Sequence, residues 1–139
     1  METVRVELDG QDELVFEAKA DGKFRISVIG CSHLMEKVKT LRSKNGTDPR
    51  KWEVPNGDHH SDLLLREFIL RCQGKWQFPY AHDEVCHCRM ISTKIVDQAI
   101  IRGAHTPEAV SLQTSASTAC GTCRPEVYKI INYRLNRSA

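Results

Sequence analysis

Three runs of alternating apolar and polar residues open the chain and predict three β-strands. Their apolar positions, spaced two residues apart, are Val4, Val6 and Leu8, then Leu14, Phe16, Ala18 and Ala20, then Phe24, Ile26 and Val28. Asp9-Gly10 and Asp21-Gly22 separate the runs, and Asp-Gly is a strong hairpin signal. The pattern therefore predicts an antiparallel meander of three strands.

The apolar spacing then changes to three or four residues, which predicts helices. We expect a first helix with Ser32 as its cap and Asn45-Gly46 at its end. We expect a second helix from about Ser61 to Gly74. The inward residues are Leu34, Val38 and Leu41 in the first helix and Leu64, Leu65, Phe68, Ile69 and Cys72 in the second. A small three-stranded antiparallel sheet with two helices is an α+β core.

The remainder of the chain has a helical pattern after Val85. Residues 76–84 are predicted to be a linker, which separates an α+β domain at 1–75 from an all-α domain at 85–139. We expect helices from Ser92 to Arg102, from Thr106-Pro107, and from Cys120–Cys123 to about Leu135. The first of these should bury Ile95, Val96, Ala99 and Ile100. This second core is thin, near the size at which a metal usually has to contribute to stability.

Charge and hydropathy exclude several classes of protein. The 139 residues include 20 Lys and Arg against 18 Asp and Glu, with no basic block, so nucleic-acid binding is not indicated. No apolar run approaches the roughly 20 residues of a membrane span. The start, METVRVELDG, has no apolar segment typical of a signal peptide. We therefore expect a cytoplasmic protein without membrane or nucleic-acid partners.

The cysteines carry the clearest chemical signal. Four of them form two close pairs, in Cys86-His87-Cys88 and in Cys120-Gly121-Thr122-Cys123. Cysteines of cytosolic proteins are more often thiols or metal ligands than disulfides. A binuclear iron–sulfur cluster needs four thiolates, two on each iron, which two pairs supply directly. The favoured interpretation is one [2Fe–2S] cluster bound by Cys86, Cys88, Cys120 and Cys123. Structural zinc, dithiol redox chemistry or no metal remain alternatives, although zinc pairs usually have wider spacing.

The segment VCHCRMISTKIVDQAI…ACGTCRPEVYKII, within Val85 to Leu135, resembles the bacterioferritin-associated ferredoxin family of [2Fe–2S] domains. The same module forms the middle of NifU-type scaffold proteins. The resemblance implies a compact helix–turn–helix fold in which all four cysteines ligate iron. His87 and Arg89 would then lie near the cluster and tune it electrostatically, whereas the alternative for His87 is a solvent-facing loop residue.

The first half contains a second candidate site. Cys31 and His60 each lie at a predicted helix start, so they can converge, and a helix N-terminus favours thiolate. Two segments of this half, GKFRISVIGCS and DHHSDLLLREFI, resemble elements of the U-type cluster-assembly scaffold domain. His60 stands where that domain has a cysteine, and Asp12 stands for that domain's aspartate. The family's Cys-Gly-Asp motif is absent. The alternative is that Cys31 is a small apolar residue and that the histidines are surface residues.

These observations favour an iron–sulfur protein in cluster assembly or transfer, whose partner is a cluster-acceptor or redox protein. A ferredoxin-like module for one-electron transfer and a cluster-dependent sensor are the alternatives. We expect no enzymatic activity, because the chain lacks a phosphate-binding loop, a nucleophile elbow and a His-Glu-x-x-His motif. The sequence is also compatible with a homodimer.

Overall fold

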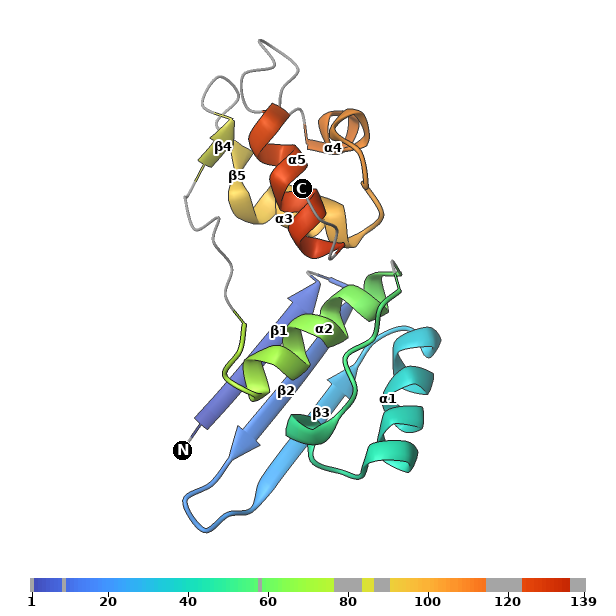
Figure 1. The fold of residues 1–139 in the computed structure, drawn as a ribbon, viewed down its shortest axis with the longest axis vertical. Coiled ribbons are helices and arrows are strands. Elements are labelled where there is room, and N and C mark those ends of the chain that lie inside the picture. The colour runs from blue at the N-terminus through green and yellow to red at the C-terminus, as the bar shows by residue number, and fades with distance from the viewer. Residues whose placement is uncertain are drawn as a thin grey trace. The chain divides into compact units, whose positions relative to one another are not determined.

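The computed structural model describes residues 2–8, 10–57, 59–76, 84–86, 91–114 and 124–135. The chain folds into two compact units. One unit comprises Met1–Gly57 and Ser61–Gln77, and the other comprises Asp58–His60 and Phe78–Ala139. Figure 1 shows the strands and the two longest helices of the first unit, and the three shorter helices of the second.

The strands of the first unit are those that the alternation predicts. They are β1 (Glu2–Leu8), β2 (Asp12–Ala18) and β3 (Phe24–Ile29), in an antiparallel sheet of order β1-β2-β3. Gly10 and Gly22 adopt φ angles of 76° and 85° at the two turns, a conformation that glycine takes without the steric cost of a side chain. The α+β fold class is therefore confirmed, and Gly10 and Gly22 lie at the two turns where the sequence predicts them.

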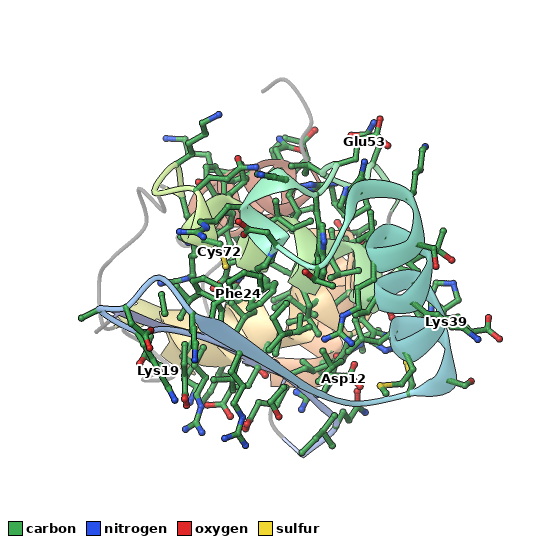
Figure 2. All side chains as sticks on the ribbon, turned by 90° about the horizontal axis from the view of Figure 1, so that it is seen from below. Asp12, Lys19, Phe24, Lys39, Glu53 and Cys72 are labelled. Carbon is green, nitrogen blue, oxygen red and sulfur yellow. The ribbon has the colours of Figure 1, made fainter. Side chains whose placement is uncertain are left out.

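Two helices cover one face of this sheet (Figures 1 and 2). They are α1 (Ser32–Asn45) and α2 (His60–Cys72), joined by a loop that contains a short 3-10 helix, η1 (Pro49–Lys51). Val4 pairs with Phe16, and Phe16 pairs with Ile26, so these side chains share the inner face. Phe16 is completely buried, and Ile26 on the edge strand is half-buried.

The loop between α1 and α2 covers the outer side of α2. Trp52 packs against Phe68 with ring centroids 6.4 Å apart, and its indole N–H donates to the Gly46 carbonyl at 2.8 Å. Arg66 donates to the Pro55 carbonyl at 3.4 Å. As a result α2 is buried continuously from Ser61 to Ile69, which explains why its sequence is apolar on more than one face.

The described part of the second unit contains three helices and a short strand pair. The helices are α3 (Thr93–Ile101), α4 (Pro107–Thr114) and α5 (Arg124–Arg134), and the strands are β4 (Glu84–Cys86) and β5 (Ile91–Ser92). Asp97 of α3 accepts two hydrogen bonds of 2.6 Å from Arg134 of α5, whose side chain is 5% exposed. This buried ion pair fixes one helix against the other.

Three details differ from the sequence prediction. The second unit is not wholly helical, because β4 and β5 pair, and they are too short for their alternation to stand out. Ile95 is 50% exposed, since the buried face of α3 centres on Val96 and Ile100 instead. The N-cap of α1 is Cys31 rather than Ser32: the Cys31 sulfur accepts from the Leu34 N–H.

We expect Asp97→Ala to lower the stability of the second unit by about 3–5 kcal/mol, because it leaves the buried Arg134 guanidinium without that carboxylate. Hydrogen exchange should quicken at the amides of α3 and α5 but not at those of α1. The exposed Lys44–Glu53 pair is the control, and Glu53→Ala should cost less than about 1 kcal/mol. Unchanged exchange in α3 and α5 would contradict this role for the buried pair.

Candidate metal centres

Asp12 is the first residue of the central strand and lies on its buried side. It pairs with Leu8 in the sheet and shares the inner face with Leu14 and Phe16, so the alternation of β2 points its carboxylate toward the helices. Its side chain is almost completely enclosed, with 4% of the residue exposed. Buried carboxylates normally have hydrogen-bonding or metal partners, and Asp12 accepts a hydrogen bond of 2.9 Å from the Cys31 N–H.

Cys31 follows the end of β3 and caps α1. The Leu34 N–H donates to its sulfur over 3.4 Å, and the Ser61 hydroxyl lies 3.7 Å from the same sulfur within hydrogen-bonding distance. The Leu34 N–H thereby orients the sulfur at the N-terminus of α1. Ser61 is completely buried, and the sequence prediction did not assign it a role.

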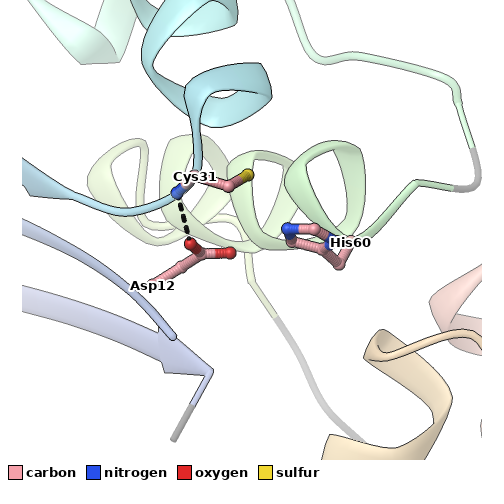
Figure 3. A group of neighbouring side chains, drawn as sticks. All are labelled: Asp12, Cys31 and His60. Atoms are coloured by element: carbon pink, nitrogen blue, oxygen red, sulfur yellow. Dashed lines mark hydrogen bonds between the residues drawn. The ribbon is translucent and has the colours of Figure 1, made fainter. Parts of the chain in front are cut away.

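His60 is the first residue of α2, and its ring completes a group of three. One possible ligand atom from each of Asp12, Cys31 and His60 lies within 4.8 Å of the others. Figure 3 shows the sulfur and the imidazole turned toward the same side of the carboxylate. The structure therefore brings Cys31 and His60 together, as expected from their helix starts, and places Asp12 beside them, while metal binding there stays a prediction.

Two contacts hold this group in place. Gly30 approaches the carboxylate so closely that a Cβ there would lie 2.4 Å from Asp12 Oδ1 and 2.8 Å from Leu34 Cδ2. Lys37 of α1 forms an ion pair with the buried Asp62, two residues after His60 in α2. The ion pair ties the two helices together close to the residues that each contributes. Neither Gly30 nor Lys37 was identified from the sequence.

The four cysteines of the second unit are only partly described. Cys86 ends β4, whereas Cys88, Cys120 and Cys123 lie outside the described residues, so their predicted meeting is not tested. In the sequence, Cys123 directly precedes Arg124, the first residue of α5. The donor set itself fits the cluster, because four thiolates are what a [2Fe–2S] centre requires.

Residues 84–133 match the family model of the BFD-like [2Fe-2S] binding domain. The chain is an iron–sulfur protein. The matched segment contains all four paired cysteines and nearly coincides with the predicted limits of 85 and 135, so the resemblance to this family is confirmed. The match to the BFD-like domain does not extend into the first unit. The resemblance of the first unit to U-type scaffolds stays a prediction.

Comparisons with curated proteins and with solved structures gave no match. In the part of the chain that the structure describes, no helix combines the length and the apolar character needed to cross a bilayer.

Protein purified without air should contain about two irons and about two sulfides per chain and absorb visible light. Replacing any of Cys86, Cys88, Cys120 and Cys123 by serine should remove most of the iron and the colour, because a thiolate ligand is lost. Cys72→Ala is the control, since this buried residue ends α2 in the other unit. Colourless protein with one bound zinc ion that these four serine variants lose would instead favour the structural-zinc alternative.

Gly30→Ala should destabilise the first unit by about 1–3 kcal/mol, because the added methyl group collides with Asp12 and Leu34. Both tryptophans of the chain lie in this unit, so urea unfolding followed by tryptophan fluorescence measures its stability. Ser32→Ala is the matched control: Ser32 is exposed and is not the cap, so the change should be below about 0.5 kcal/mol. Equal effects of the two substitutions would be inconsistent with the close approach at Gly30.

Proposed function

We propose that this protein acts in the assembly or transfer of iron–sulfur clusters, without being an enzyme itself. The observation that carries the proposal is the presence in one chain of two different sets of side chains of the metal-ligating types. The BFD-like domain supplies four cysteines, and outside that domain Asp12, Cys31 and His60 lie within ligand distance of one another. A protein that only carried electrons would have no need of the second set.

The two sets differ in how firmly they would hold metal. Four thiolates fill the terminal positions of both irons of a [2Fe–2S] cluster, so the cluster leaves only when the thiolates of an acceptor replace them. Three mixed ligands leave a coordination position open, which favours exchange with a partner. Cys31 and His60 are half-buried rather than enclosed, which supports access from outside. The partner we propose is an acceptor protein that lacks its cluster.

The test is to mix the cluster-loaded chain with an apo-ferredoxin in the presence of an iron chelator. We expect the [2Fe–2S] circular dichroism signal to move to the acceptor faster than the chelator removes iron. An acceptor whose ligand cysteines are replaced by serine is the control and should gain no signal.

The alternative, one-electron transfer, predicts a different outcome in the same mixture. The cluster would stay on the chain and would be reduced and reoxidised reversibly when a ferredoxin reductase is added. Retention of the cluster under conditions in which it cycles between two oxidation states would overturn the transfer proposal.

A further inference from the structure

We propose that Asp12, Cys31 and His60 bind one divalent first-row transition-metal ion, with a fourth position open to an external ligand. The inference deepens the proposed function, on which it rests for its biological meaning. The inference is that these three residues bind a single metal ion rather than a cluster.

The ligand set has the composition of a site for such an ion. A carboxylate oxygen, a thiolate sulfur and an imidazole nitrogen together suit zinc or ferrous iron better than calcium or magnesium, which prefer oxygen alone. Bonds of about 2.0–2.3 Å place the ligand atoms of a tetrahedral ion about 3.3–3.7 Å apart. The three ligand atoms already lie within 4.8 Å of one another, so small side-chain rotations suffice.

The charges and contacts also fit an ion. Asp12 and Cys31 together bring two negative charges when the thiol is deprotonated, which neutralises a divalent cation. The Cys31 N–H holds the carboxylate, and the Leu34 N–H holds the sulfur, so both are oriented before any metal arrives. Figure 3 shows one carboxylate oxygen engaged by Cys31 and the other directed toward the His60 side.

A [2Fe–2S] cluster does not fit the same residues. Two irons need four ligands, and this group offers three, of which one is sulfur. Cys72 is the other thiol whose side chain is described in the first unit, but it is twelve residues along α2 from His60. At 1.5 Å per residue that places it about 18 Å along the helix axis, too far to join. The group is therefore suited to one ion.

The open position follows from the number of ligands. Three protein ligands and a fourth, exchangeable position are the arrangement of zinc sites that bind external molecules. Half-burial of Cys31 and His60 leaves one side of the site within reach of a small thiol.

The experiment uses the full chain with its [2Fe–2S] cluster loaded, so that the four paired cysteines are occupied. Co²⁺ is titrated without air, and its ligand-field bands are recorded as difference spectra; Zn²⁺ is titrated in parallel by calorimetry. Asp12→Asn, Cys31→Ser and His60→Gln each remove one ligand while conserving shape. His59→Gln is the matched control, because His59 is exposed and its ring lies 4.2 Å from that of His60.

We expect one Co²⁺ per chain with a four-coordinate spectrum, and affinity at least about tenfold lower in each ligand variant but unchanged in His59→Gln. Added 2-mercaptoethanol should increase the sulfur-to-cobalt charge-transfer absorption. The proposal is overturned by absence of binding, by full affinity in Cys31→Ser, by an unchanged spectrum on adding the thiol, or by reconstitution of a second cluster that Cys31→Ser abolishes.

The outcome also separates this inference from the proposed function. Cluster transfer to apo-ferredoxin without Co²⁺ binding would refute the single-ion site alone. Co²⁺ binding in a chain that keeps its cluster would refute the transfer role alone.

Discussion

The hydrogen bond from the Cys31 N–H to Asp12 Oδ1 is the interaction on which the geometry of the first unit depends. It joins the start of the central strand to the point where β3 gives way to α1, nineteen residues later in the chain. The bond requires Gly30, because any side chain there would occupy the space of the carboxylate. One polar contact therefore fixes the strand, the turn and the first helix relative to one another.

Because Asp12 is buried, its hydrogen bond affects the free energy of folding. A carboxylate taken out of water costs free energy unless partners replace the lost hydration. Asp12 lies among Leu8 and Leu14 on the inner face of the sheet, where an apolar residue would pack well. The sequence places this carboxylate next to a thiol and an imidazole instead. The Cys31 N–H supplies one such partner, and the metal ion that we propose would supply another.

Much of the fold follows from patterns that are local in the sequence. The alternation around Phe16 and the Asp-Gly turns predicted the meander, because strand period and turn chemistry act over a few residues. The cap of α1 could not be predicted in the same way. Ser32 is the better N-cap by residue type, but the course of the chain from Gly30 places the Cys31 sulfur over the Leu34 N–H instead.

The site was predictable in part for the same reason. Cys31 and His60 could be placed at helix starts from local signals, and their convergence followed from the expected layering. The supporting contacts could not be found this way, because they depend on distances between distant segments. The contact of 3.7 Å between the Ser61 hydroxyl and the Cys31 sulfur forms only when α1 and α2 lie together on the sheet, as does the ion pair of Lys37 with Asp62.

The composition of the two ligand sets limits what each can hold. Thiolates share charge with iron and bridging sulfide, so a set of four suits a cluster that stays bound. Replacing sulfur by carboxylate and imidazole gives harder donors, which favour a single ion and make its binding depend on deprotonation of each ligand. A single ion with an open position is reached directly by an incoming ligand, whereas a cluster held by four thiolates leaves only when the thiolates of an acceptor replace them.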